Sequence, residues 1–125
     1  MDILRRFLQT YGSPLSSYAQ DFIQIGDDTN IEWTLLPAIS LVESGGGKKE
    51  CGKFNPFGWG SPCWDFVDYS TAIRAIANSI SSSPTYGLYQ KTKQLADLAE
   101  VYNAADVVSW EKNVTYFQEK IRSFQ

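Results

Sequence analysis

Residues 35–59 read LLPAISLVESGGGKKECGKFNPFGW, and the predicted fold is based on this stretch. Its first part is apolar and ends on a carboxylate, Glu43, which Ser44 and three glycines follow directly. Glycines in succession end a helix, so we expect a helix that begins between Glu32 and Leu35 and ends near Ser44. Four positions recur at i, i+3, i+4 and i+7, on one face of that helix: Leu36, Ile39, Ser40 and Glu43.

Glu43 is the first candidate for chemistry. Because it shares a helix face with apolar residues, we expect its carboxyl group to be partly desolvated. Burial disfavours the charged form and raises the pKa of a carboxyl group, which is what a general acid needs near neutral pH. The simpler alternative is a glutamate in solvent at the end of a helix.

The segment from Gly45 to Asp65 carries many turn residues and aromatic residues. Its glycines and prolines exclude a long helix, so we expect a short hairpin or an irregular lobe. Cys51 and Cys63 enclose this lobe. A disulfide there would contribute about 3 kcal/mol in the chain-entropy model, and it fits a protein that works outside the cell. We expect this bridge; the alternative is two buried free thiols.

The rest of the chain has helical periodicity interrupted by turn signals. We therefore predict a mostly α-helical single domain, residues 1–125, with about six helices and a small β or irregular lobe between the third and fourth. The third helix is the one described above. The others are a short helix capped by Asp2 and stopped at Gly12–Pro14; one from Ser16 or Ser17 to a break at 26–30; one capped by Ser70 that runs to Ile80; one capped by Thr92 that runs to Tyr102, after a loop at 85–91; and one from Ser109 to Phe124, after a loop at 103–108.

Composition excludes several classes of function. The net charge is −3 and no basic patch occurs, which argues against nucleic-acid binding. The chain has no histidine, which removes Ser-His-Asp and Cys-His catalysis and histidine-ligated metals. We expect no metal and no cofactor. No apolar run is long enough to span a membrane, and the N-terminus lacks the features of a signal peptide. The chain is then an intracellular protein, or a mature or excised domain of an exported one.

The motifs LLPAISLVESGGGK and C-x-x-x-NPFGWG strongly resemble the glucosaminidase branch of the lysozyme-like superfamily, which includes endo-β-N-acetylglucosaminidase domains. The stretches SPLSSYAQDFI, LAEVYN and WEKNVTYFQEKI resemble further segments of the superfamily, so the resemblance covers most of the chain. It implies a lysozyme-like α+β fold and a peptidoglycan hydrolase that cleaves β-1,4 bonds between N-acetylglucosamine and N-acetylmuramic acid. It also implies an extracellular or cell-wall location, and we expect a monomer.

The resemblance assigns roles to individual residues. Glu43 would be the general acid, and Ser44 would orient Glu43 or a sugar group. Tyr102 would lie across the cleft, near the reacting sugar. Four residues would line the substrate groove: Asn55, Phe57, Gly58 and Trp59. The pattern departs from that of the transglycosylases at Ala104-Ala105, where Ala-Gly is usual.

Several alternatives stay open at this point. Glu50, Asp65 and Asp68 are candidates for a second carboxylate or are structural; members of the superfamily often use one glutamate and the N-acetyl group of the substrate. Trp59 lines the groove or packs under the lobe, and Tyr102 lines the groove or closes a core stripe. The function is N-acetylglucosaminidase, or alternatively a lytic transglycosylase, a muramidase or a glycan-binding module without turnover.

Overall fold

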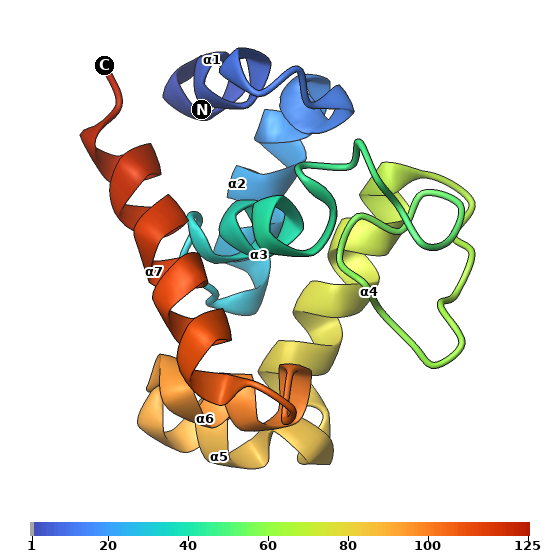
Figure 1. The fold of residues 1–125 in the computed structure, drawn as a ribbon, viewed down its shortest axis with the longest axis vertical. Coiled ribbons are helices and arrows are strands. Elements are labelled where there is room, and N and C mark those ends of the chain that lie inside the picture. Colours follow the sequence, from blue (N-terminus) through green and yellow to red (C-terminus); the bar gives the residue numbers. More distant parts are fainter. Residues whose placement is uncertain (1) are drawn as a thin grey trace.

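A computed structural model describes residues 2–125 as a mostly helical chain (Figure 1). It contains seven α-helices within these residues. The elements follow in the order α1 (Asp2–Thr10), η1 (Pro14–Tyr18), α2 (Ala19–Thr29), α3 (Leu35–Ser44), α4 (Tyr69–Ser82), η2 (Pro84–Tyr86), α5 (Gly87–Thr92), α6 (Leu95–Tyr102) and α7 (Val107–Ser123), where η marks a 3₁₀ helix.

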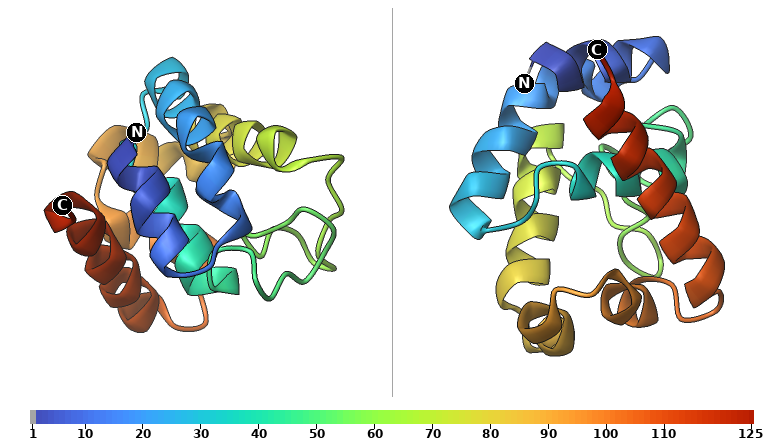
Figure 2. Two further views of the ribbon diagram at one scale, coloured as in Figure 1. Left: turned by 90° about the horizontal axis from the view of Figure 1, so that it is seen from above. Right: turned by 90° about the vertical axis from the view of Figure 1, so that its left-hand side faces the viewer.

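Helix α3 lies at the centre of the fold, with α2, α4 and α7 around it and α5 and α6 below (Figures 1 and 2). Most of its side chains are buried, which explains why its sequence is apolar nearly all round. Its C-terminal end is closed by Gly45, whose φ of 63° is left-handed, and the amide of Gly46 donates to the Ser40 carbonyl at 3.0 Å. This left-handed (αL) helix end, in which the Gly45 amide donates to the Leu41 carbonyl, fixes where the chain leaves the helix, directly after Glu43 and Ser44.

The buried apolar residues form one cluster to which each of the helices α1–α4, α6 and α7 contributes. The two ends of the chain meet at the top of Figure 1, where the rings of Phe7 and Phe124 pack edge to face at 5.4 Å and Arg6 donates to the carbonyl of Gln125. The helical body thereby forms a closed frame around α3, and the loop after α3 projects from one side of it (Figure 2).

Several details of the predicted helices are wrong. Thr92 does not cap the helix that runs to Tyr102: it ends α5, and Gln94 precedes α6. The segment 85–91 was expected to be a loop, but it lies in η2 and α5, so the predicted number of helices was too low. The expected break at 26–30 begins later, because α2 continues to Thr29 and ends at a left-handed Asn30. Asp68, not Ser70, caps α4, and Asp106, not Ser109, caps α7; each carboxylate accepts the amide three residues on.

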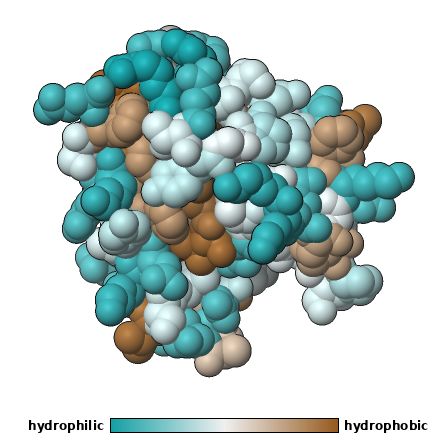
Figure 3. All heavy atoms as spheres, turned by 45° about the horizontal axis from the view of Figure 1, so that its top comes forward, coloured by the Kyte–Doolittle hydropathy of each residue, from teal (hydrophilic) through white to brown (hydrophobic). Residues whose placement is uncertain are grey.

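The predicted lobe was either a short hairpin or irregular, and residues 45–68 form an irregular one. We call these residues the α3–α4 loop. Within residues 2–125 the only β pairing is a single bridge between Gly52 and Asn55, so the α+β detail of the predicted fold is not supported. The expected disulfide is present and joins Cys51 to Cys63. Figure 3 shows brown, apolar residues at the right-hand edge, where this loop lies. Its exposed apolar side chains are Phe54, Trp64 and Val67.

Candidate active site

Glu43 lies in the last turn of α3, where the helical body meets the α3–α4 loop. Its side chain is half-buried. The indole N–H of Trp110, which is 2% exposed on α7, donates to Glu43 Oε2 at 2.8 Å. One oxygen of the carboxyl group is therefore held from the helical side.

The environment of Glu43 favours its protonated form. Burial raises the pKa of the Glu43 carboxyl above its ordinary value, and the hydrogen bond from Trp110 lowers it by a smaller amount. The raised pKa has the direction that a general acid requires. Because Oε2 accepts the indole N–H, we assign the proton of the neutral acid to Oε1.

Gly58 leaves room for that second oxygen. A Cβ atom on Gly58 would lie 2.7 Å from Glu43 Oε1, and Gly58 has a φ of +62°, in the left-handed region. Glycine is thus required at this position for two reasons, the backbone conformation and the close approach to the carboxyl group. The exposed backbone of Gly58 is the part of the loop that faces the free oxygen of Glu43.

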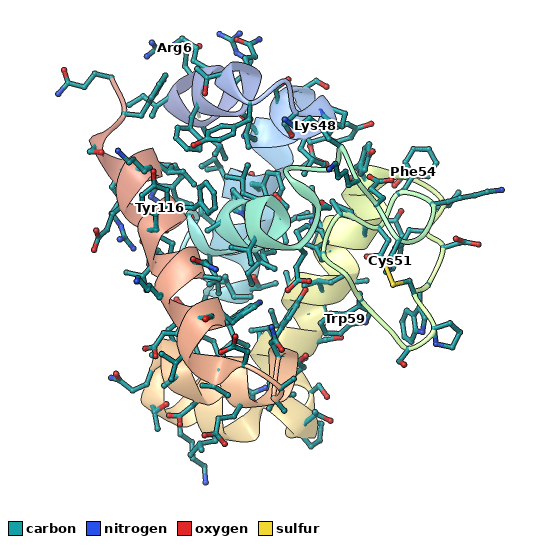
Figure 4. All side chains as sticks on the ribbon, viewed as in Figure 1. Arg6, Lys48, Cys51, Phe54, Trp59 and Tyr116 are labelled. Carbon is teal, nitrogen blue, oxygen red and sulfur yellow. A yellow bond between two sulfur atoms is a disulfide. The ribbon has the colours of Figure 1, made fainter. Side chains whose placement is uncertain are left out.

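A cleft of about 290 Å³ opens beside Gly58. Aromatic rings form most of its wall. The ring of Trp59 stacks on that of Tyr86 at 5.9 Å and meets that of Tyr102 edge to face at 5.6 Å. Figure 4 shows Trp59 on the side of the loop that faces the helical body. The residues that line the cleft are Gly58, Trp59, Gly60, Tyr86, Val101 and Tyr102. Flat aromatic faces of this kind suit the apolar C–H faces of sugar rings.

Tyr102 connects the loop to the acid. Its hydroxyl donates to the carbonyl of Phe57 at 2.6 Å, and its ring stacks on Trp110 at 5.0 Å. Burial raises the pKa of the Tyr102 hydroxyl well above its ordinary value, with a further contribution from Glu43. In this arrangement the hydroxyl holds the loop against α6, and Tyr102 also lines the cleft.

Ser44 lies next to Glu43 in sequence but faces the interior. Its hydroxyl donates to the carbonyl of Pro56 at 2.6 Å and accepts the amide of Gly47 at 2.9 Å. The residue is 4% exposed. The structure therefore places Ser44 between α3 and the loop, out of contact with the cleft.

Two of the predicted groove residues are also buried. Asn55 is 0% exposed; its amide donates to the carbonyls of Trp59 and Trp64 and its oxygen accepts the amide of Trp59. The side chain of Phe57, also 0% exposed, packs edge to face on Phe22. These two side chains fix the shape of the loop from inside, and only Gly58 and Trp59 of the four predicted groove residues line the cleft.

Sequence reasoning missed Trp110 and Tyr86. Trp110 falls within the last predicted helix, and it is buried. A buried indole N–H needs an acceptor, and this requirement is the signal that could have paired it with the half-buried carboxylate. Tyr86 gave no such signal, because it lies in the short η2 segment between Pro84 and Gly87.

The three candidates for a second carboxylate have other environments. Asp65 accepts the amide of Lys53 at 2.8 Å, and Asp68 caps α4. Glu50 belongs to the loop itself; its Oε1 lies near Gly47 and is buried without a hydrogen-bond partner among residues 2–125. None of the three lines the cleft; Glu43 does not line it either, but its Oε1 approaches the lining residue Gly58.

Within the described residues 2–125, no helix combines the length and apolarity needed to cross a membrane. The same residues contain no group of three acidic or sulfur-bearing side chains that could hold a metal ion. Comparison of the chain with protein families, with curated proteins and with solved structures finds no match.

Proposed function

We propose that this chain is a peptidoglycan hydrolase of the N-acetylglucosaminidase type, with Glu43 as its general acid. One observation carries the proposal: the Glu43 carboxyl group is half-buried, held by Trp110 on Oε2, and its Oε1 approaches Gly58, which lines an aromatic cleft. A protonated carboxyl group beside a sugar-binding surface is the arrangement that cleavage of a glycosidic bond requires.

The proposed reaction begins with a glycan strand bound along Trp59 and Tyr102. Glu43 Oε1 gives its proton to the glycosidic oxygen as the bond from that oxygen to the sugar C1 breaks. The carbonyl oxygen of the 2-acetamido group of the same sugar attacks C1 and forms a cyclic intermediate. Glu43, now a carboxylate, takes a proton from the water that opens this intermediate, so the acid is regenerated.

The involvement of the substrate's acetamido group is supported by the acidic residues of the loop. Retaining glycosidases that use an enzyme nucleophile need a second carboxylate about 5–5.5 Å from the first. Asp65 and Asp68 are engaged by backbone amides. A substrate with an N-acetyl group at C2 supplies its own nucleophile, and this favours N-acetylated polymers over other glycans.

The disulfide between Cys51 and Cys63 supports an extracellular or cell-wall location. It closes the loop that carries Gly58 and Trp59, so an oxidising compartment would also stabilise the cleft. The proposed partner is the peptidoglycan polymer, bound by a monomer.

Mass spectrometry of digested, borohydride-reduced peptidoglycan tests the proposal. We expect new reducing ends on N-acetylglucosamine. Reducing ends on N-acetylmuramic acid would identify a muramidase, and anhydro-muramic acid ends would identify a lytic transglycosylase. Binding without any new end would leave a glycan-binding module and refute the enzymatic proposal.

A further inference from the structure

A second hollow lies away from Glu43. Its volume is about 610 Å³, larger than that of the cleft, and the two share no residue. It is formed where the C-terminal end of α2, the segment 30–33 and helix α5 meet. Its lining includes Asp27, Asn30, Glu32, Trp33, Tyr89 and Lys93. Segment 30–33 precedes α3, whereas Glu43 is near the other end of this helix, which is about 15 Å long.

The hollow combines aromatic faces with hydrogen-bonding groups. Trp33 and Tyr89 are both half-buried, so each offers a flat face at the rim of the core. Asn30 and Asp27 are exposed beside them. Burial raises the pKa of the Tyr89 hydroxyl, and the nearby Glu32 carboxylate raises it further. Both residues line the hollow.

The charges around the hollow disfavour an ionic ligand. Glu32 is paired with Arg122 on α7. Neither Asp27 nor Lys93 takes part in an ion pair among residues 2–125, so one negative and one positive group are left. The Lys93 ammonium lies 5.7 Å from the centroid of the Tyr89 ring, where it would repel a second cation. Asp27 and Glu32 would repel an anion.

We propose that this hollow is a second carbohydrate site, which binds a neutral N-acetylated hexosamine strand against Trp33. Aromatic rings match the C–H faces of sugars, and amide and carboxylate groups hydrogen-bond hydroxyl and acetamido groups. The site is independent of Glu43 and of turnover. A catalytic cleft and a separate site on one small domain would hold the protein on its polymer between cleavage events.

The test is a titration of the uniformly ¹⁵N-labelled Glu43→Gln protein with the β-1,4-linked trimer of N-acetylglucosamine. The Glu43→Gln change prevents turnover and lies outside the hollow. We expect the indole N–H resonance of Trp33 to shift saturably, with a dissociation constant in the millimolar range. In Trp33→Ala the indole resonance is lost, so the backbone amide resonance of Asn30 reports binding instead. We expect this substitution to abolish the shift of the Asn30 amide.

Asn30→Gly provides a variant that keeps the fold. Asn30 ends α2 with a φ of 58°, which glycine adopts without strain, so only the amide group is lost. We expect the affinity at the Trp33 resonance to fall about two- to tenfold. Tyr116→Ala is the matched control, because Tyr116 is 51% exposed on α7 and lines neither hollow. Figure 4 shows it on the side opposite the loop.

Three results would overturn the proposal. The first is a Trp33 resonance that does not move at the solubility limit of the trimer, and the second is an affinity that Asn30→Gly leaves unchanged. The third is a shift of the Trp33 resonance by lysine amide, a cationic ligand, that equals the shift by the trimer. Trp33 shifts and reducing-end products are separate readouts. Failure of this site would leave the catalytic proposal standing, and loss of the catalytic proposal would leave this site intact.

Discussion

The substitution Gly58→Ala tests the geometry of the acid most sharply. The added Cβ atom would lie 2.7 Å from Glu43 Oε1, whereas ordinary contacts begin near 3.4 Å, so the carboxyl group must retreat by about 0.7 Å. The retreat displaces Oε1 from the position in which it would deliver the proton. A misplacement of this size costs about 10²-fold in rate, and we expect a loss of that order.

Gly12→Ala is the matched control. Gly12 has a φ of +63°, against +62° for Gly58, but a Cβ atom there would meet nothing within 4 Å. Both substitutions place alanine at a left-handed φ, which destabilises the fold by about 1–2 kcal/mol. Both should therefore lower the Tm by roughly 3–10 °C for a chain of this size. The flexible carboxyl group of Glu43 can move aside, so the contact itself adds little to the loss of stability.

The assay pairs thermal unfolding with the release of reducing ends from purified peptidoglycan. We expect equal losses of Tm in the two variants and a loss of activity in Gly58→Ala alone. Equal activities in Gly58→Ala and Gly12→Ala would refute the assignment of Oε1 as the oxygen that delivers the proton.

Three further predictions concern the groups around the acid. Trp110→Phe removes the hydrogen bond that lowers the pKa of Glu43, so the alkaline limb of the pH–rate profile should move to higher pH; an unmoved limb would contradict this. Tyr102→Phe should lower the free energy of unfolding by about 1 kcal/mol and change kcat little, because its hydroxyl donates to the loop; a large fall in kcat at constant Tm would make the hydroxyl catalytic. Replacement of both Cys51 and Cys63 by serine should lower the free energy of unfolding by about 3 kcal/mol, measured by urea denaturation, and an unchanged midpoint would show that the bridge contributes nothing.

The sequence was informative where a long periodic pattern and a strong turn signal coincide. Helix α3 has both, because its apolar residues fill the centre of the fold and Gly45 must adopt a left-handed φ. That combination also located Glu43 at the junction of body and loop. Helix α5 has only six residues and begins at a glycine, so it gives no periodic signal, and the tertiary contacts that stabilise it are not visible in the sequence.

The sequence could name the residues of the loop but not the direction of their side chains. Asn55 and Trp59 belong to the same motif, yet the amide of Asn55 satisfies three backbone groups inside the loop while Trp59 lines the cleft. Trp110 looked like core because it is core by burial. Its contact with Glu43 depends on one polar atom, the indole nitrogen. A pattern of hydrophobic residues carries no information about the partner of that atom.

The substitution Glu43→Gln tests the central claim most directly. Burial raises the pKa of Glu43 in the folded state above its unfolded value of about 4.5, so the carboxyl group's contribution to stability is full below that pH and is lost as the pH rises. At neutral pH the glutamine variant should therefore be at least as stable as the wild type. Its turnover of peptidoglycan should fall by about 10²- to 10⁴-fold, while a folded variant that retains more than about a tenth of wild-type turnover would contradict the assignment of Glu43 as the general acid.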